Sequence, residues 1–488
     1  MSELHPSSPV DVRPSPQMLA EPREQTQRLD HFSQTLFRHL DGFGVRYCAL
    51  DLREETEDTP SIVQELAVHP EDRGKLLATL RSLEDKDYFV VQERISVIPG
   101  ARRYCLACLL SRLPTFHELT ILFGPSGSQF LPTSKEIVER REKRETTWAA
   151  APADEFRYRL FKNCLEGTKS GADGRRLRQL IGELGPERAK RVAQDLFGNR
   201  WQSAVEAART ATAGARLPSE LRRRLWWRHV SSDPQVLLKY AGKAFREVPS
   251  RWFRPKGLLV AILGPDGVGK SSFSAELLEM FRPVFASGRV LQWRPQVIKP
   301  RPEKNPLIFE PPHGKPAHGK VESMLRLLAV LVDYWVGEVV LIRPLLARSG
   351  LLVYDRNFHD ILVDTKRYRY GGPLWLLHLL ERMVPHNELV FLTLEADPET
   401  ILQRKQEVSP EEVGRQCTEY RRLAQRLPNS HVIRTDRDLE QCVAEGSRIL
   451  VGYLNQRFKK RNRQSFPSLE PPRKKKKHGS SGAGQMPA

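Results

Sequence analysis

The stretch LGPDGVGKSS, residues 263–272 of this 488-residue chain, restricts the possible folds more than any other. It satisfies the spacing GxxxxGK[ST], in which two glycines bracket four residues before a lysine and a hydroxyl residue. The apolar run GLLVAIL before it is typical of a buried strand, and SSFSAELLEM after it is typical of a helix. An ordinary glycine-rich turn would satisfy the spacing alone, but the two flanks favour a strand–loop–helix unit.

Each residue type in this loop suits a bound polyphosphate. Glycines let consecutive backbone N–H groups approach phosphate oxygens, and the following helix presents its positive amino-terminal end to the same anion. Lys270 is expected to reach the β and γ phosphates, and the Ser271 hydroxyl to help hold Mg²⁺. The sequence therefore predicts that ATP and Mg²⁺ bind here. The predicted nucleotide-binding residues are Gly264, Asp266, Gly267, Val268, Gly269, Lys270, Ser271 and Ser272.

Short apolar runs recur along the second half of the chain, with helical patterns between them. They span residues 257–263, 289–293, 350–355, 388–394 and 431–435. Strands that are apolar on both faces and alternate with helices are typical of a parallel sheet covered on both sides. We therefore predict an α/β fold for residues 251–458, with a parallel sheet of P-loop NTPase type and helices on both faces.

Phosphoryl transfer needs a carboxylate near the metal ion and cations near the moving phosphate. Asp355 follows the run LLVY at the expected carboxyl edge of the sheet, where open α/β sheets bind ligands, and Arg356 comes next. Arg404 and Lys405 would close over the phosphates from a helix, as a lid. The alternatives are a structural Asp–Arg pair and a solvated helix face. The predicted catalytic residues are Lys270, Asp355, Arg356 and Arg404, with Ser271 and Asp355 at the metal.

An acid lies inside the loop itself, at Asp266. A carboxylate beside a polyphosphate is electrostatically unfavourable unless it faces another group. One hypothesis therefore gives it a hydroxyl or amine of a second substrate. Its Pro-Asp-Gly setting equally suits a carboxylate that only stabilises the turn, and both interpretations stay open.

The chain is basic, with a formal net charge of +19, but the excess is unevenly placed. Between residues 457 and 477 there are ten Lys/Arg and one acid, a net of +9. About half of the excess therefore lies in one tail, and we do not infer that the folded body binds nucleic acid. We expect the tail to be a solvated end. A nuclear address and a contact with RNA or an anionic surface are the alternatives.

Membrane and redox signals are weak. The longest apolar stretch, residues 325–346, carries four charged residues, so we expect a buried helix rather than a membrane span. The six cysteines are scattered, and only Cys105 and Cys108 form a CxxC pair. Buried, reduced thiols in a cytoplasmic protein are the expectation.

These residues resemble the thymidylate kinase family of P-loop nucleoside monophosphate kinases. GPDGVGKSS is similar to that family's phosphate loop, including the acid at Asp266, and YDR (354–356) is similar to its Asp-Arg motif after the third strand. RVLQWRP (289–295) lies where the family carries an arginine for the acceptor's phosphate, a role that the resemblance gives to Arg294. The resemblance covers about residues 257–458 and makes a dimer an expectation.

Beyond the Asp-Arg pair the chain departs from that family. NFHDILVDTKRYRYGGP (357–373) and the PHGKP stretch (312–316) are similar to a bacterial subgroup of larger thymidylate kinase-like proteins, often associated with surface polysaccharides. The acceptor is then a nucleoside monophosphate or a glycan-related hydroxyl compound, and dTMP is not assured. A buried salt-bridge network is the alternative for residues 357–373. The candidate acceptor residues are Asp266, Arg294, His359, Asp360, Asp364 and Arg367.

The first part of the chain resembles the nucleotidyltransferase-like domain that is fused in the same subgroup. That domain carries a carboxylate–x–carboxylate strand before a His-Pro-Glu-Asp turn. Here the turn is present at 69–72, but the strand reads Val63-Gln64-Glu65. Two-metal nucleotidyl transfer needs paired carboxylates, so we predict that this unit is catalytically inactive.

The predicted organisation has five parts. They are a disordered segment (1–27), a degenerate, small α/β nucleotidyltransferase-like domain (28–148), a helical connecting region (149–250), a P-loop domain (251–458) and a disordered basic tail (459–488). The predicted function is an ATP-dependent phosphotransferase that acts on a small acceptor. The alternative is an ATP-binding regulatory or scaffolding module.

Overall fold

A computed structural model describes most of the chain. The described residues are 22–50, 63–96, 98–123, 131–144, 147–166, 171–210, 219–232, 249–297, 316–385, 389–405 and 408–462. Most of the two segments predicted to be disordered, and most of the PHGKP stretch, lie outside them. Helix α1 begins at Pro22 and α17 ends at Arg461, so both helices overlap those predicted segments by a few residues.

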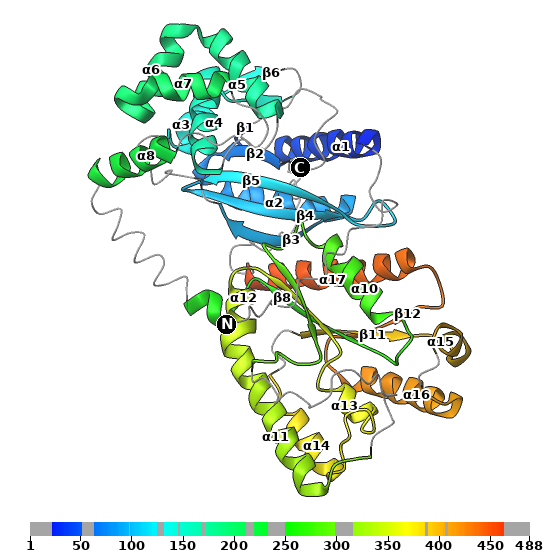
Figure 1. The fold of residues 1–488 in the computed structure, drawn as a ribbon. Coiled ribbons are helices and arrows are strands. Elements are labelled where there is room, and N and C mark those ends of the chain that lie inside the picture. The colour runs from blue at the N-terminus through cyan, green and yellow to red at the C-terminus, as the bar shows by residue number, and fades with distance from the viewer. Residues whose placement is uncertain are drawn as a thin grey trace, which may run out of the picture.

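The amino-terminal unit is built on a mixed sheet with the strand order β3-β4-β5-β2-β1-β7-β6 (Figure 1). β2 and β5 are parallel, whereas β3, β4 and β5 pair antiparallel. The strands are β1 (Tyr47–Ala49), β2 (Val63–Val68), β3 (Tyr88–Ile95), β4 (Ala101–Cys108), β5 (Thr115–Phe123), β6 (Glu142–Arg144) and β7 (Thr147–Ala149). α1 (Pro22–Gly42) and α2 (Arg73–Ser82) share a hydrophobic core with one face of this sheet.

The helical region packs on the same unit. Cys48, Ala67 and Leu122 of the sheet belong to one buried cluster with Phe156 and Leu180 of the helices. The region is therefore a helical cap on the sheet as well as a connection along the chain. Its helices are α4 (Pro152–Glu166), α5 (Gly171–Leu184), α6 (Pro186–Phe197), α7 (Trp201–Arg209) and α8 (Ser219–Ser232), and α3 (Ser134–Glu139) precedes the region.

The carboxyl-terminal unit contains a five-stranded sheet with the order β12-β11-β8-β10-β9, in which every pair is parallel. The strands are β8 (Leu258–Leu263), β9 (Gly288–Gln292), β10 (Leu351–Asp355), β11 (Leu389–Glu395) and β12 (Ser430–Arg434). The α/β class and the parallel sheet that the apolar runs predict are confirmed. β8, the strand that feeds the glycine loop, lies in the middle of the sheet.

Helices cover both faces of this sheet because its strands are apolar on both sides. Leu258, Val260 and Ile262 of β8 point into a core with α10 and α17, whereas Leu259 and Ala261 point into a core with α11 and α14. The helices are α10 (Lys270–Met280), α11 (Lys320–Gly337), α12 (Arg343–Ala347), α13 (Asp360–Val363), α14 (Leu374–Glu381), α15 (Pro398–Arg404), α16 (Pro410–Arg426) and α17 (Leu439–Arg461). Shorter turns are η2 (Pro70–Asp72), η3 (Leu83–Lys86), η4 (Gly198–Arg200) and a π-helical segment, η5 (Glu338–Ile342).

The two units meet through α17 and the end of α10 (Figure 1). Val91 and Ala107 of the amino-terminal sheet lie in the same buried cluster as the inner residues of α17. Phe116 of β5 packs on Phe281 at the end of α10, with ring centroids 5.3 Å apart. Lys256 Nζ donates to the Glu93 carbonyl at 2.9 Å. The units therefore share one apolar core and a polar seam.

One sequence expectation is wrong. Helix α11 was expected to be buried, but only its inner face is, and a row of apolar side chains on its outer face is exposed. The six cysteines are buried free thiols. Within the described part of the chain, we find no helix with the length and apolar character needed to span a membrane.

Candidate nucleotide-binding site

The glycine loop joins β8 to α10 and depends on backbone conformations that favour glycine. Gly264, Gly267 and Gly269 have φ values of 145°, 85° and 101°. A Cβ at Gly264 would lie 2.6 Å from the carbonyl oxygen of Leu394, so β11 leaves no room for a side chain there. The loop is therefore fixed between two strands and the start of a helix.

Lys270 is the first residue of α10, and its side chain folds back over the loop. Its ammonium group donates to the Gly264 carbonyl at 2.7 Å and to the Pro265 carbonyl at 2.8 Å, and it lies 3.3 Å from Asp266 Oδ1. The side chain is 5% exposed, so these oxygens replace most of its water. The loop thus holds a desolvated positive charge at the place where the phosphates are expected.

Ser271 and Asp355 lie together, as the sequence predicts. The Ser271 hydroxyl donates to Asp355 Oδ2 at 2.8 Å, because β8 and β10 are neighbours and both end at this edge. Asp355 Oδ1 is buried and has no hydrogen-bond partner in the described structure. A hydroxyl oxygen beside a carboxylate oxygen with spare acceptor capacity is a donor set that Mg²⁺ accepts, so these residues fit the predicted metal.

Asp266 is surrounded by cations. It forms ion pairs with Arg356 and Arg367, and the Lys270 ammonium is within 4 Å. Three positive side chains around one carboxylate leave an excess of positive charge, which suits an anionic ligand. Arg356 has φ 75°, a strained value for a residue with a side chain, and its N–H donates to the Ile262 carbonyl at 3.2 Å.

The loop that carries Arg294 follows β9 and packs against α11; we call it the Arg294 loop. Arg294 Nη1 donates to Asp333 Oδ2 at 3.1 Å, and the N–H of Gln296 donates to the same oxygen at 3.0 Å. Asp333 is fully buried, so the arginine is held from behind by an internal carboxylate. The rings of Trp293 and Tyr368 pack beside it at a tilt, with centroids 4.9 Å apart. Asp333 and Tyr368 were missed at the sequence level, although a lone acid in the apolar run of α11 was a usable signal.

Asp360 and Asp364 lie in polar networks that brace the chain behind the Asp-Arg pair. Asp360 accepts from the Asn357 N–H and from the Tyr420 hydroxyl, both at 2.6 Å, and burial raises the pKa of its carboxyl. Asp364 accepts from Gln416 Nε2 at 3.1 Å and from the Arg367 N–H at 3.0 Å. These contacts are hydrogen bonds from neutral donors, whereas the alternative that the sequence left open was a network of salt bridges. Acceptor binding by Asp360 and Asp364 stays a prediction.

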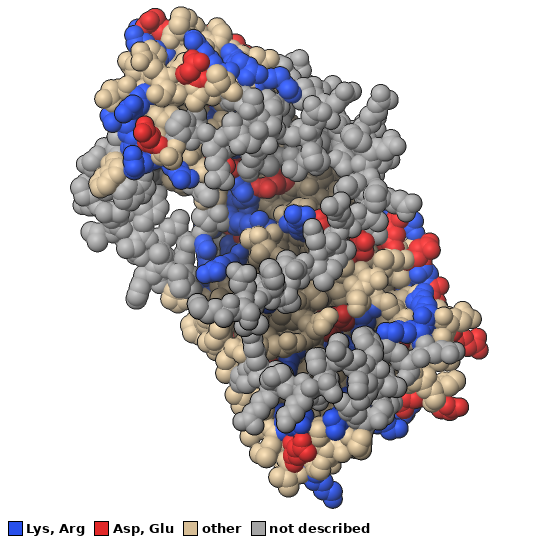
Figure 2. Space-filling view, in the orientation of Figure 1, with Lys and Arg blue, Asp and Glu red and all other residues tan. Residues whose placement is uncertain are grey.

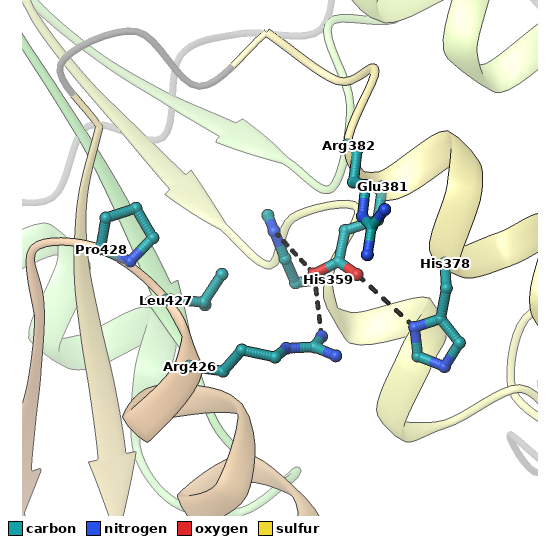
Figure 3. Close-up of a pocket in the computed structure, with 7 residues that line it drawn as sticks. All are labelled: His359, His378, Glu381, Arg382, Arg426, Leu427 and Pro428. Carbon is teal, nitrogen blue, oxygen red and sulfur yellow. Dashed lines mark hydrogen bonds and ion pairs between the residues drawn. The ribbon is translucent and has the colours of Figure 1, made fainter.

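His359 does not join the Asp266 cluster. Its buried ring lies 3.6 Å from Glu381 and faces a cavity of about 550 Å³ (Figure 3). Glu381 is also held by Arg426 at 2.9 Å and lies 3.6 Å from His378. His359 therefore lies in a different environment from the other candidate acceptor residues.

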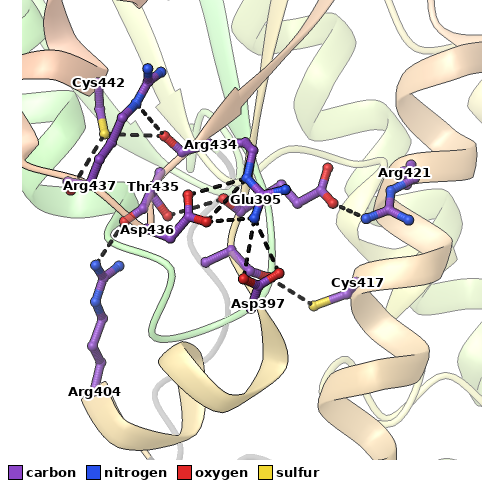
Figure 4. A network of polar contacts seen from close by, with 11 residues as sticks. Glu395, Asp397, Arg404, Cys417, Arg421, Arg434, Thr435, Asp436, Arg437 and Cys442 are labelled. Atoms are coloured by element: carbon purple, nitrogen blue, oxygen red, sulfur yellow. Dashed lines mark hydrogen bonds and ion pairs between the residues drawn. The ribbon is translucent and has the colours of Figure 1, made fainter.

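The predicted lid residue Arg404 lies at the end of α15, where its Nη2 donates to the Thr435 carbonyl at 2.7 Å (Figure 4). The next residue, Lys405, covers the loop more closely, since a Cβ at Gly267 would lie 3.2 Å from its Cβ. Two carboxylates near Arg404, those of Asp397 and Asp436, form ion pairs with Arg434. The described structure thus places Lys405 nearer to the loop backbone, with Arg404 tied to the end of β12.

The amino-terminal unit has its own buried charge pair. Glu65, the carboxylate that remains in the Val63-Gln64-Glu65 strand, lies 2.8 Å from Lys162 of α4, and both side chains are at most 3% exposed. The Lys162 ammonium group therefore neutralises Glu65 inside the unit. In the described part of the chain no cluster of metal-ligating side chains was found.

The parallel sheet, the glycine loop between its central strand and α10, and the Ser271–Asp355 pair define a domain with a P-loop kinase-like fold. No family model matches the sequence, and no curated protein is significantly similar to it. Among solved structures, the thymidylate kinase of Ehrlichia chaffeensis resembles a carboxyl-terminal part of the chain. The two are 17% identical, with 39% of this chain and 97% of that one covered at a TM-score of 0.27. The likeness is distant, and the fold class depends on the strand order and loop described above.

Proposed function

We propose that the P-loop domain is an ATP- and Mg²⁺-dependent phosphotransferase for a small anionic or hydroxyl acceptor. The observation that carries the proposal is the contact of Ser271 with Asp355 beside Lys270, at the same sheet edge as the Asp266 cluster. A metal-side carboxylate, a phosphate-binding lysine and cations for a second anion are the parts that phosphoryl transfer needs.

The roles of the residues follow from their positions. The loop amides and Lys270 would hold the β and γ phosphates, and Ser271 and Asp355 would hold Mg²⁺, which supplies charge neutralisation. Arg356 and Arg367 would release Asp266 and bind the transferring and acceptor groups. An acceptor oxygen attacks the γ-phosphorus, the bond to the bridging oxygen breaks, ADP leaves with the electron pair, and any acceptor proton passes to solvent.

A second function, nucleotide-dependent binding without transfer, is supported by one observation. Both oxygens of Asp266 are engaged by arginines, and Lys270 is bound by the loop's own carbonyls. In a module of this kind, contacts to ATP would replace these internal contacts. The resulting change in the loop would reach a partner through α10.

The test is transfer of labelled γ-phosphate to a panel of acceptors, among them nucleoside monophosphates and phosphorylated or free sugars. We expect label on at least one acceptor and none with Lys270→Ala. Label that survives Lys270→Ala would contradict the site assignment. If no acceptor raises turnover above that of Lys270→Ala while ATP still binds, the phosphotransferase proposal is wrong and the binding module remains.

A further inference from the structure

The helical region carries most of the positive charge that the basic tail does not. Residues 171–232, which run from α5 to α8, contain 13 Lys/Arg and 6 Asp/Glu, a net of +7. The tail holds +9 of the total of +19, so +3 remains for the rest of the chain. We call residues 171–232 the basic cap. Charge counted over the whole folded body hides this concentration, because it averages the cap with regions that are nearly neutral.

Most acids of the basic cap are matched by a neighbouring cation. The pairs in the described structure are Arg176–Glu183, Lys190–Glu187 and Arg157–Asp195. Many arginines of the cap are exposed and form no ion pair in the described part of the chain. They are Arg175, Arg188, Arg191, Arg200, Arg209, Arg222 and Arg223. Only Glu206 and Glu220 are exposed acids of the described cap without such a pair, so the surface is strongly positive.

Contacts between the helices make the cap one packed unit. Arg178 of α5 donates to the Arg209 carbonyl of α7 at 3.2 Å, and Arg224 of α8 donates to the Phe197 carbonyl of α6 at 3.0 Å. Lys and Arg side chains outnumber Asp and Glu over this upper end of the molecule (Figure 2). Because the exposed arginines are distributed over several helices, they suit a long polyanion better than a small anion. α5 has 14 residues and is about 21 Å long, the length of about six phosphates along one nucleic acid strand.

The side chains of the cap suit phosphates and bases. Arginine provides 12 of the 13 cations. A guanidinium group binds phosphate oxygens with two parallel N–H donors and stacks on flat rings, which an ammonium group does not do. Arg223 and Trp227 are both exposed and are four residues apart on α8, so they lie on one face of the helix. An exposed tryptophan beside a guanidinium group can stack an unpaired base next to its phosphate.

We propose that the basic cap binds single-stranded nucleic acid through its phosphates, without reading its sequence, while Trp227 stacks a base. A membrane surface fits less well. A helix that lies on a bilayer buries an apolar face, and in the described part of residues 171–232 Trp227 is the one large apolar side chain that is exposed. The cap belongs to the amino-terminal unit and not to the glycine loop, so the proposal does not depend on the function proposed above.

Fluorescence anisotropy of the full chain with labelled RNA or DNA single strands of about 20 nucleotides tests the proposal. Arg188→Ala/Arg191→Ala/Arg222→Ala/Arg223→Ala removes four exposed cations from helices, in which alanine is favoured. We expect the affinity to fall by about 100-fold at about 50 mM salt. The slope of log K against log salt should fall by about 3, because each phosphate contact to a single strand contributes about 0.7. Losses with both probes assign the binding to groups that RNA and DNA share, and a loss with RNA alone adds the 2′-hydroxyl.

The matched control removes the same charge elsewhere. Arg81→Ala/Arg289→Ala/Arg348→Ala/Arg382→Ala takes away four exposed arginines outside the cap and should change the affinity by less than about 3-fold. Lys270→Ala should bind the probes as the wild type does. Trp227→Ala should weaken binding of a single strand about 10-fold and of a duplex much less, because paired bases cannot stack on it.

Three results would overturn the proposal. The wild type would fail to bind either probe at about 50 mM salt, where phosphate contacts are strong. The cap variant and the control would lose affinity equally, which would assign the binding to the tail or to net charge. The chain would sediment with vesicles of phosphatidylcholine and phosphatidylserine but leave both probes free, which would assign the cap to lipid.

Discussion

Asp355 combines two properties at the scale of a single residue. One of its oxygens accepts from Ser271, and the other is buried without a hydrogen-bond partner in the described structure. A buried carboxylate oxygen without a hydrogen-bond partner is costly, and a cation would satisfy it. The arrangement therefore favours a metal over a merely structural Asp–Arg pair, which is the alternative that the sequence allows.

Asp355→Asn tests this directly. The amide oxygen can still accept from Ser271, but the negative charge for Mg²⁺ is lost, so we expect Mg²⁺-dependent ATP turnover to fall by about 10²–10³-fold. Asp397→Asn, two residues after strand β11, is the control and should change turnover little, because its carboxylate faces Arg434. Equal losses of turnover in the two variants would show that Asp355 has no specific role in Mg²⁺-dependent turnover.

His117 gives a pH dependence to the amino-terminal unit. It is 5% exposed, stacks on Phe32 with centroids 4.6 Å apart, and burial lowers its pKa to about 4 from an ordinary 6.5. The folded state therefore disfavours the protonated ring. The stabilisation that the neutral ring provides is complete above pH 6.5 and is lost as the pH falls towards 4, by about 3 kcal/mol in total.

Urea unfolding between pH 7 and pH 4 measures this effect. We expect His117→Phe to keep the stacking and to lose less stability than the wild type over that interval. His378→Gln, which removes a half-exposed histidine of the other unit, should follow the wild-type curve. A His117→Phe curve parallel to the wild type would mean that another group sets the pH dependence.

At the scale of secondary structure, one glycine fixes the position of the Arg294 loop. A Cβ on Gly337, at the end of α11, would collide with the ring of Pro295. The loop can therefore lie against α11, where Asp333 reaches Arg294, only because this helical position lacks a side chain.

Gly337→Ala should destabilise the protein by about 1–3 kcal/mol, since Pro295 and the loop must move. Gly452→Ala on α17 is the matched control: nothing lies within 4 Å of its added Cβ, so we expect a gain of up to about 1 kcal/mol from helix propensity. Thermal unfolding of the two variants measures both changes. A neutral Gly337→Ala would contradict the proposed role of the close contact.

The same scale explains what the sequence could and could not predict. Ser271 and Asp355 were predicted to meet because each follows an apolar strand, and parallel strands place their carboxyl ends at one edge. The role of Asp333 was missed because helical periodicity identifies the apolar face of a helix only. It does not show that a carboxylate on that helix is buried and binds a neighbouring loop. The burial of α11 was predicted wrongly for a related reason. Both faces of this helix are apolar, so the sequence does not show which face packs against the rest of the chain.

At the scale of the whole molecule, α10 connects the nucleotide loop with the amino-terminal unit. It begins at Lys270 and ends beside Phe281, which packs on Phe116 of β5. α17 packs against α10 and against β3. The two units should therefore open together rather than separately.

Hydrogen exchange with and without Mg²⁺ and ATP tests this coupling. At 100 times the Kd, ligand binding stabilises the folded state by about 2.7 kcal/mol. We expect slower exchange in β3 and β4 as well as in β8, with no such change in Lys270→Ala. Protection confined to β8 and α10 would show that the units unfold independently.

The way Lys270 is held has a practical consequence. The loop's own carbonyls and Asp266 surround its ammonium group, so these contacts within the protein brace the loop. Preparations stripped with a chelator should remain intact, and sulfate or phosphate buffers should compete with the nucleotide for the same positive charge. The choice of buffer anion will then affect the measured affinity for the nucleotide.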